Sequence, residues 1–300
     1  MKKNISIIGV PMDLGQTRRG VDMGPSAIRY AGVVERLENL NHSIEDLGDI
    51  EIGSREKTAS TESNLKNLKA VAEASETLAG QVDNVVGKGN FPLVLGGDHS
   101  IAIGTLAGLG KHYPNMGVIW YDAHGDLNTG ETSPSGNIHG MPLAVSLGLG
   151  DPTLTGIGGY ENKIKAENIV IIGARSLDEG EKVLIKEKGI KVFTMHEIDR
   201  MGMTAVMEEA ISYLNERGVD GVHLSLDLDG LDPHDAPGVG TPVLGGISYR
   251  ESHLAMEMLE EANILTSAEF VEVNPILDER NKTATVAVAL IGSLFGEKLL

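Results

Sequence analysis

Short aliphatic runs alternate along this chain with longer stretches of helical spacing, and that alternation constrains the fold more than any other feature. Strands are predicted at residues 5–10, 92–95, 117–121, 168–173, 191–194, 221–226 and 264–273. Helices are predicted at residues 25–40, 63–86, 101–109, 178–188, 204–217, 248–261 and 282–295. Such an order is typical of a parallel sheet covered by helices on both faces. We therefore predict an α/β fold with three layers, αβα, around a central and mostly parallel sheet.

No Pro/Ser-rich linker, composition break or repeat divides the sequence, so we expect residues 1–300 to form one domain. The stretch 126–159 is rich in Gly, Pro, Ser and Thr and could be mistaken for a linker. A long loop inside a compact domain is more often functional. With only 4 Phe and 1 Trp, the core has to be mostly aliphatic.

Composition excludes several classes of protein. The chain has no cysteine, which removes disulfides, thiolate metal sites and a cysteine nucleophile, and is compatible with a reducing cytoplasm. The sequence contains no run of about 18 apolar residues, so no membrane span is predicted. The apolar patch near the start is too short for a signal peptide. A net charge of −18 argues against nucleic acid as a partner and favours divalent cations and cationic small molecules.

Residues 117–126 read GVIWYDAHGD, an apolar strand that ends in Asp122, His124 and Asp126. Alternate residues of a strand share one face, and open α/β sheets bind ligands at the carboxyl ends of their strands. Buried carboxylates at such a position are costly unless they are paired or bind a metal. An exposed polar turn after a strand is the plainer interpretation of this motif taken alone.

Two further strands end in similar side chains. Residues 93–100 read LVLGGDHS and bring His99 to a strand end, while residues 224–233 read LSLDLDGLDP and bring Asp227 and Asp229 to another. A lone histidine is usually structural, and a carboxylate pair before Gly and Pro also fits a solvated turn. Asp232 fits that turn well because Asp before Pro is a common turn element, so we leave it out of the ligand set.

Together these strand ends supply six candidate metal ligands: His99, Asp122, His124, Asp126, Asp227 and Asp229. Four carboxylates and two imidazoles are too many for one ion, and they suit a pair of divalent metals bridged by carboxylates and a water or hydroxide. Oxygen-rich ligation with imidazole favours Mn²⁺ or a similar ion, although physics alone does not identify the metal.

The motifs GGDHS, DAHGD and SLDLDGLDP, in this order, resemble those of the ureohydrolases, and arginases most closely. Residues 126–142, DLNTGETSPSGNIHGMP, resemble the arginase loop that holds the amino-acid end of the substrate. Residues 269–275, EFVEVNP, resemble the strand with a guanidinium-binding glutamate. The resemblance covers nearly the whole chain, and it implies two Mn²⁺ per subunit. One ion would be bound by His99, Asp122, Asp126 and Asp227, and the other by Asp122, His124, Asp227 and Asp229, with Asp122 and Asp227 bridging.

The resemblance also implies roles for the remaining polar residues. His139 would be a proton shuttle, Asp126 would take or relay the hydroxide proton, and Glu272 would receive the guanidinium group. A carboxylate within an apolar strand needs a cationic partner, which agrees with that role for Glu272, although a structural salt bridge would explain it equally well. The family's substrate-reading positions fall on Asn128, Ser135, Asp178, Glu181 and Thr241.

The reaction implied is hydrolysis of L-arginine to L-ornithine and urea by a metal-bridging hydroxide, in a homo-oligomer that is a trimer or a hexamer. The nearest alternative is agmatinase or another ureohydrolase of guanidino substrates, which the loop 128–139 argues against because a substrate without an α-carboxylate does not need its Asn and Ser side chains. A zinc-dependent deacetylase would leave the second aspartate pair idle. A non-catalytic binding protein would not need the complete ligand set.

Overall fold

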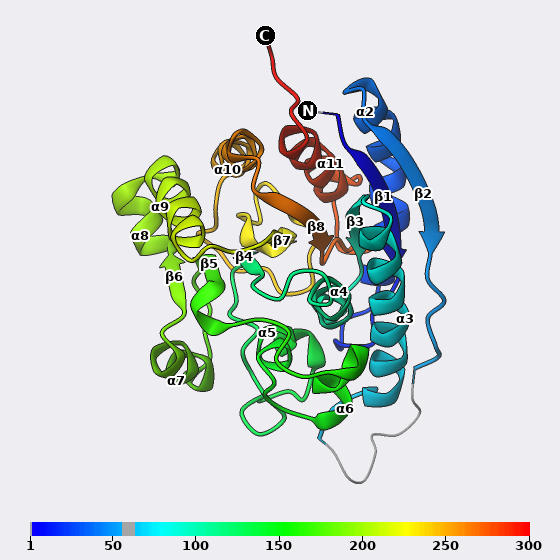
Figure 1. Ribbon diagram of the computed structural model, residues 1–300, viewed down its shortest axis with the longest axis vertical. Helices are drawn as coiled ribbons and strands as arrows, with labels where there is room; N and C mark the ends of the chain where they lie inside the picture. The colour runs from blue at the N-terminus through cyan, green and yellow to red at the C-terminus, as the bar shows by residue number, and fades with distance from the viewer. Residues whose placement is uncertain (1, 56–63) are drawn as a thin grey trace.

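The computed structural model describes residues 2–55 and 64–300 and is built on one sheet of eight parallel strands (Figure 1). The strands lie in the order β2-β1-β3-β8-β7-β4-β5-β6. In chain order they are β1 Asn4–Val10, β2 Ser43–Asp49, β3 Phe91–Gly96, β4 Gly117–Tyr121, β5 Ile169–Ala174, β6 Lys191–Thr194, β7 Val222–Asp227 and β8 Leu265–Val271. The prediction of a three-layer α/β fold with a central parallel sheet is confirmed.

Helices cover both faces of the sheet (Figure 1). One face carries α1 Gly24–Tyr30, α2 Val33–Asn39, α8 Met195–Met201, α9 Met203–Glu216, α10 Tyr249–Ala262 and α11 Lys282–Leu294. The other carries α3 Leu68–Gly87, α4 Ala102–Leu109, α5 Pro142–Ser146, α6 Pro152–Thr155 and α7 Glu179–Lys188. Each layer packs its apolar residues against the sheet.

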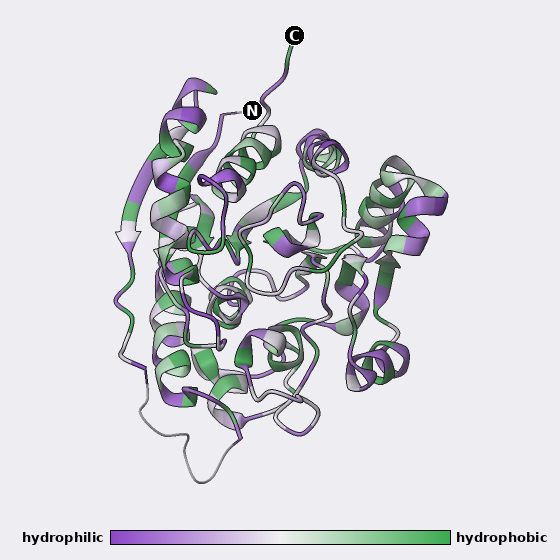
Figure 2. Ribbon diagram, turned by 180° about the vertical axis from the view of Figure 1, so that it is seen from behind, coloured by the Kyte–Doolittle hydropathy of each residue, from purple (hydrophilic) through white to green (hydrophobic). Residues whose placement is uncertain are grey.

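The core is therefore in two parts, separated by the sheet. Alternation along each strand divides the side chains: Ile119 and Tyr121 of β4 belong to one cluster, and Val118 and Trp120 to the other. All four are buried, as expected for a parallel strand with helices on both sides. Edge strand β2 is instead mostly hydrophilic, with Ile44 and Leu47 as its only large hydrophobic residues (Figure 2).

Four neighbouring strands, β3, β8, β7 and β4, occupy the middle of the sheet. The polar motifs at 98–99, 122–126, 227–229 and 272 follow the carboxyl ends of these same four strands. Because parallel strands end at one edge of the sheet, this order brings the motifs together. Gly97, at the end of β3, allows the loop after β1 to approach closely, because a Cβ at this position would lie 2.0 Å from the carbonyl oxygen of Met12.

Several boundaries differ from the prediction. The helix expected at 25–40 is two helices, α1 and α2, separated by Gly32 with φ 90°. The strand β2 was not predicted, because its sequence SIEDLGD is polar for a strand, as edge strands often are. The predicted loop 126–159 contains the short helices α5 and α6.

Two other elements are shorter than predicted. The helix expected at 63–86 begins at Leu68 after Asn67, whose φ of 53° is incompatible with a continuing helix, and its predicted first residue lies outside the described residues. The strand expected at 264–273 ends at Val271, and Glu272 has φ 67°, in the left-handed region. Glu272 therefore projects from the end of β8 and not from within it.

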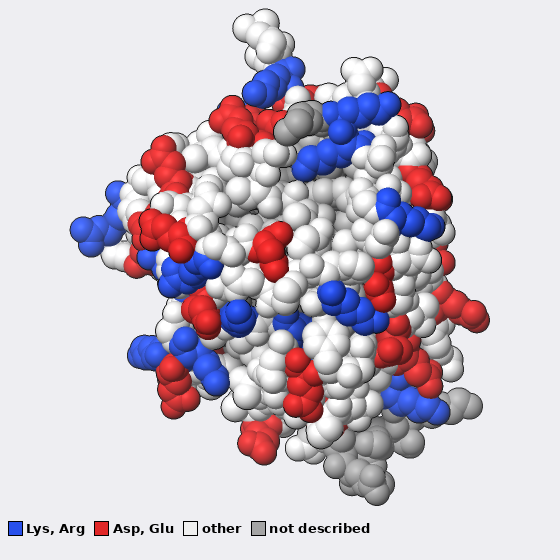
Figure 3. Space-filling model, viewed as in Figure 1, with Lys and Arg blue, Asp and Glu red and all other residues white. Residues whose placement is uncertain are grey.

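On the face seen in Figure 3, Lys and Arg side chains are interspersed with Asp and Glu over most of the surface. A phosphate-binding surface would gather the basic side chains instead. Among the described residues, no helix is long and apolar enough to cross a membrane.

Candidate functional site

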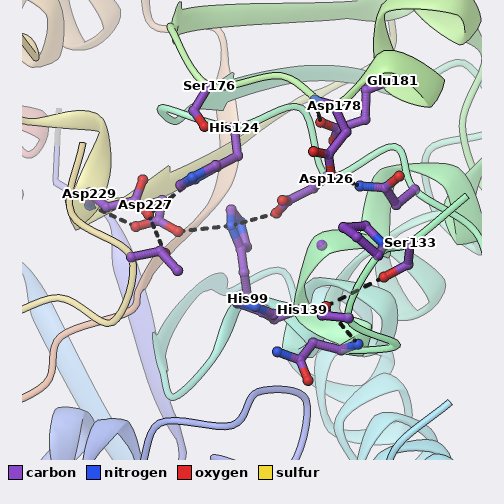
Figure 4. Close-up of a pocket in the computed structure, with 16 residues that line it drawn as sticks. His99, His124, Asp126, Ser133, His139, Ser176, Asp178, Glu181, Asp227 and Asp229 are labelled. Atoms are coloured by element: carbon purple, nitrogen blue, oxygen red, sulfur yellow. Dashed lines mark hydrogen bonds and ion pairs between the residues drawn. The ribbon is translucent and has the colours of Figure 1, made fainter. Parts of the chain in front are cut away.

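His99 lies at the centre of a buried cluster of carboxylates. Its Nδ1 is 3.1 Å from Asp122 Oδ2, 3.0 Å from Asp126 Oδ2 and 3.2 Å from Asp227 Oδ2. Figure 4 shows the imidazole between Asp126 and Asp227. Although three oxygens surround this nitrogen, it is buried without a hydrogen-bond partner among the described residues. An imidazole nitrogen that faces several carboxylate oxygens is the arrangement that a shared metal ion satisfies.

A second cluster lies beside the first and shares Asp122. His124 Nδ1 is 3.4 Å from Asp122 Oδ1 and 3.2 Å from Asp229 Oδ2. The two oxygens of Asp122 thus face the two different imidazoles. The groups His99, Asp122, Asp227 and Asp122, His124, Asp229 each have ligand atoms close enough to hold a metal ion. These residues fit a pair of divalent ions with Asp122 between them.

Local hydrogen bonds fix two of these carboxylates, Asp122 and Asp227, at their strand ends. Asp122 Oδ1 accepts from the backbone N–H of His124 at 2.7 Å, and Trp120 Nε1 donates to Asp122 Oδ2 at 3.0 Å. The same turn recurs after β7, where Asp227 Oδ1 accepts from the N–H of Asp229 at 2.7 Å. Asp227 therefore turns its other oxygen, Oδ2, to His99. Its predicted role as a second bridge stays a prediction.

The two clusters contain more carboxylates than positively charged side chains that could balance them. Burial, together with the neighbouring Asp122, raises the pKa of Asp126 to about 6. Burial alone would lower the pKa of His99, but the close contacts with the carboxylates of Asp122, Asp126 and Asp227 raise it well above the usual value. Protons and metal ions are alternative means of balancing such a site, and divalent cations balance it more completely.

Glu272 is held from three directions. Its Oε1 accepts from the backbone N–H of His99 at 3.0 Å and lies 3.3 Å from His139 Nδ1, while its Oε2 accepts from Gln16 Nε2 at 2.9 Å. The residue is 1% exposed and is not part of the cavity lining, whereas His139, which contacts it, is. Glu272 backbone N–H donates to Gly97 O at 2.9 Å, which ties β8 to the β3 turn.

His139 is placed between the cavity and Glu272. Burial lowers its pKa, but the hydrogen bond and the charge of Glu272 outweigh that effect and raise it to about 9. The imidazole is therefore protonated on both nitrogens and positively charged at neutral pH. Consistently, the same contact lowers the pKa of Glu272 against the opposing effect of burial.

The polar loop after β4 is anchored on α7. Asn128 Nδ2 donates to Asp178 Oδ2 at 2.8 Å. Glu181 accepts from two backbone N–H groups, that of Leu127 at 3.1 Å and that of Asp178 at 2.7 Å. Burial raises the pKa of Glu181 to about 7. One buried carboxylate thus joins the start of the loop to the start of the helix.

A cavity of about 130 Å³ opens over both clusters (Figure 4). It is lined by His99, His124, Asp126, Asn128, Ser133, Pro134, Ser135, Asn137, His139, Gly140, Ser176, Asp178, Glu181, Asp227, Asp229 and Thr241. Thr241 Oγ1 donates to Asp229 Oδ2 at 2.9 Å, which links this predicted pocket residue to the second cluster. All the predicted site residues lie in the lining except Asp122 and Glu272, which are buried beneath it.

The sequence did not single out several residues of this site. Ser133 and Asn137 stand in the polar loop among the predicted Asn128 and Ser135, so the same loop argument could have found them. Gln16 and Ser176 carry no such signal, because each comes from a different loop and reaches the site only through the folding of the sheet. Asp232, which was left out of the ligand set, instead accepts from Gly245, Gly246 and His234 N–H groups.

Known proteins share both the sequence and this architecture. The model of the arginase family matches residues 3–296. An arginase of Bacillus caldovelox is 77% identical over 299 residues, covering 99% of this chain and all of that protein. An arginase of Bacillus subtilis (strain 168) is 70% identical over 300 residues and covers both chains fully. The native structure of the Bacillus caldovelox arginase at pH 5.6 superposes with a TM-score of 0.97 over 99% of this chain and all of that one.

Proposed function

This chain belongs to the arginase family, and from that premise we propose that it hydrolyses L-arginine to L-ornithine and urea at a pair of Mn²⁺ ions. The observation that carries the proposal is the pair of clusters that share Asp122, at the ends of the three strands β3, β4 and β7 and beneath one cavity. Full-length identity of 77% to an arginase supports the choice of reaction.

We assign one ion to His99, Asp122, Asp126 and Asp227, and the other to Asp122, His124, Asp227 and Asp229, with Asp122 and Asp227 shared. Two observations support this assignment. His99 Nδ1 has no hydrogen-bond partner among the described residues, and the two oxygens of Asp122 face different histidines, His99 and His124. Two divalent ions bound there would lower the pKa of a shared water and supply a hydroxide nucleophile near neutral pH. Manganese is chosen over other divalent ions because of the family and the oxygen-rich ligands.

Glu272 attracts the planar guanidinium group of the substrate. Its carboxylate is buried and kept ionised, and His139 already pairs with it as a cation, so a cationic group is accommodated at this position. A guanidinium that takes over or shares this pairing is brought to the floor of the cavity beside the two clusters. Orientation of the reacting carbon against the nucleophile is the main contribution of this contact.

Proton transfer falls to Asp126 and His139. Asp126 Oδ2 lies within the first cluster and is the base that takes or relays the proton of the nucleophile. When the bond between the guanidinium carbon and the ε-nitrogen of arginine breaks, that nitrogen leaves as the δ-amine of ornithine and needs a proton. His139 lines the cavity, is protonated at neutral pH and supplies that proton directly or through water.

The amino-acid end of the substrate is read by the polar loop and α7. We assign Asn128 and Ser135 to the α-carboxylate and Asp178 to the α-amino group, with Glu181 and Thr241 supporting the pocket. The anchoring of Asn128 on Asp178 supports this assignment, because it holds a polar pair at the mouth. We further propose that residues 1–300 act as one domain in the cytoplasm, in a homo-oligomer that is a trimer or a hexamer, as the family membership suggests.

The test compares two guanidino substrates. The protein is stripped of metal, reloaded with Mn²⁺, and assayed for urea release from L-arginine and from agmatine, beside a metal-free sample. We expect urea from L-arginine only with metal, and much less from agmatine. Preference for agmatine would overturn the substrate, and activity without metal would overturn the metal mechanism.

A further inference from the structure

Residues 64–67, directly before α3, connect the two loops that form opposite walls of the site. The backbone N–H of Lys66 donates to Gly136 O in the polar loop at 3.1 Å, and Asn67 Nδ2 donates to Leu14 O in the loop after β1 at 2.7 Å. The fit is close, because a Cβ at Gly136 would lie 2.3 Å from Asn64 O. This segment therefore holds the loop of the amino-acid end against the loop that carries Gln16.

The side chain of Lys66 fixes the orientation of a cavity residue. Lys66 Nζ donates to Asn137 Oδ1 at 2.9 Å and to Thr17 Oγ1 at 3.3 Å, and Thr17 Oγ1 donates to the same Oδ1 at 3.1 Å. An ammonium group can only donate, so the amide atom that faces it has to be the oxygen. The amide nitrogen of Asn137 is then turned away, and among the described residues it has no acceptor.

Asn137 lines the cavity, so its amide nitrogen is left to donate to a ligand there. The backbone N–H of Asn137 already donates to Ser135 Oγ at 3.2 Å, which joins this residue to a predicted reader of the α-carboxylate. A hydrogen-bond donor whose orientation is fixed by a neighbouring side chain, as Lys66 fixes Asn137, is suited to bind an anionic group.

Lys66 also supplies positive charge next to a cavity that has few positively charged groups. Among the residues that the structure describes, it is the only Lys or Arg that hydrogen-bonds to a side chain of the cavity lining. Apart from the histidines, of which His139 is protonated, the charged residues of the lining are acidic: Asp126, Asp178, Glu181, Asp227 and Asp229. An α-carboxylate that enters between these groups needs a positive charge on the side where it binds.

We propose that Lys66 determines the preference of this enzyme for α-amino-acid substrates, by orienting Asn137 and by placing a positive charge beside the α-carboxylate. Lys66 acts through Asn137 and is a positioning residue. The inference rests on the proposed arginase function, since it assigns a specificity device to that same site.

The experiment compares Lys66→Met with Lys69→Met in the Mn²⁺-loaded protein. Lys69 lies three residues further on, its side chain is 83% exposed, and the control removes the same charge from the same region. We expect Lys66→Met to raise the KM for L-arginine about tenfold, with kcat within about twofold of wild type, because a hydrogen bond that serves a charged group is lost. The kcat/KM for agmatine should stay unchanged or rise, and Lys69→Met should match wild type.

Two measurements separate this role from a purely structural one. Equilibrium binding of L-ornithine, followed by calorimetry, should weaken about tenfold in Lys66→Met, and Lys66→Arg should restore much of it. Thermal unfolding is recorded for every variant, and Lys66→Gln replaces Lys66→Met if the latter does not fold. Equal losses on L-arginine and agmatine, or a KM like that of Lys69→Met, would overturn the inference while the arginase function stands. A wild-type protein that neither hydrolyses L-arginine nor binds L-ornithine would overturn both.

Discussion

Gln16 Nε2 donates a hydrogen bond to Glu272 Oε2 at 2.9 Å, although the two residues are 256 positions apart in the sequence. Gln16 is 2% exposed, and a Cβ at Gly240 would lie 2.7 Å from its Oε1, so the amide fills a space left by a glycine. The neutral amide orients the carboxylate without neutralising it. Glu272 thereby keeps its negative charge for a cationic partner.

Replacing Gln16 by Met should therefore weaken substrate binding. A hydrogen bond to a charged group contributes about 1.5–3 kcal/mol, so we expect the KM for L-arginine to rise about tenfold or more in the Mn²⁺-loaded enzyme. Steady-state kinetics measure the change. The neighbouring and exposed Arg18, changed to Gln, is the control, and an unaltered KM in Gln16→Met would show that the amide does not orient Glu272.

Asp122 is shared by both clusters, so Asp122→Asn should lose both metal ions, whereas Asp229→Asn should lose only one. Metal content after dialysis is measured by mass spectrometry. Loss of an outer-shell partner already costs about 10–100-fold in affinity or activity, so kcat should fall by more than about 100-fold in Asp122→Asn. Asp232→Asn changes a carboxylate that follows β7, as Asp229 does, but lies outside the clusters, so this variant should keep both ions. Equal metal loss in Asp229→Asn and Asp232→Asn would contradict the assignment.

The ion pair of His139 and Glu272 should make stability depend on pH. In the folded protein burial lowers the pKa of His139 but Glu272 raises it to about 9, whereas an unfolded histidine titrates near 6.5. A raised pKa means that the stabilisation is complete below about pH 6.5 and is lost as the pH rises through about 9. The melting temperature of wild type should therefore exceed that of His139→Asn most at pH 6 and least at pH 10.

Both proteins keep the same metal ligands, so the pH dependence of metal binding is common to the two and cancels in this difference. The measurement is thermal unfolding of both metal-loaded proteins across pH 6 to 10. A difference that grows toward alkaline pH would have the wrong sign for this ion pair.

Glu181 should stabilise the polar loop by accepting from the N–H groups of Leu127 and Asp178. Glu181→Ala leaves both donors without a partner, and we expect the free energy of unfolding to fall by about 2 kcal/mol. Denaturant unfolding measures this change. Glu179, two residues earlier on α7 with a side chain 89% exposed, provides the matched control. Glu179→Ala should change stability by less than about 0.5 kcal/mol. A similar loss in both variants would mean that the removal of a negative charge from the first turn of α7, and not of the two hydrogen bonds, accounts for the effect.

The fold class and the residues of the two candidate metal clusters could be predicted because both depend on local patterns. Aliphatic runs followed by Asp or His mark the ends of buried strands, and parallel strands end at one edge of a sheet. The helix at 25–40 was predicted too long because apolar spacing continues through Gly32, where the backbone changes direction with φ 90°. Strand β2 was missed because a polar edge strand lacks the pattern of a buried one.

The sequence by itself determined the αβα layers, the strand ends and the residue types of the candidate metal clusters, since side-chain periodicity and residue type are properties of short segments. Only the tertiary structure decided that β3, β8, β7 and β4 are neighbours, and hence that His99 meets Asp122 and Asp227. It also decided that Gln16 supports Glu272 and that Lys66 supports Asn137. Strand order depends on how crossovers pack the whole chain, and contacts between distant loops follow from that order, so no local pattern contains them.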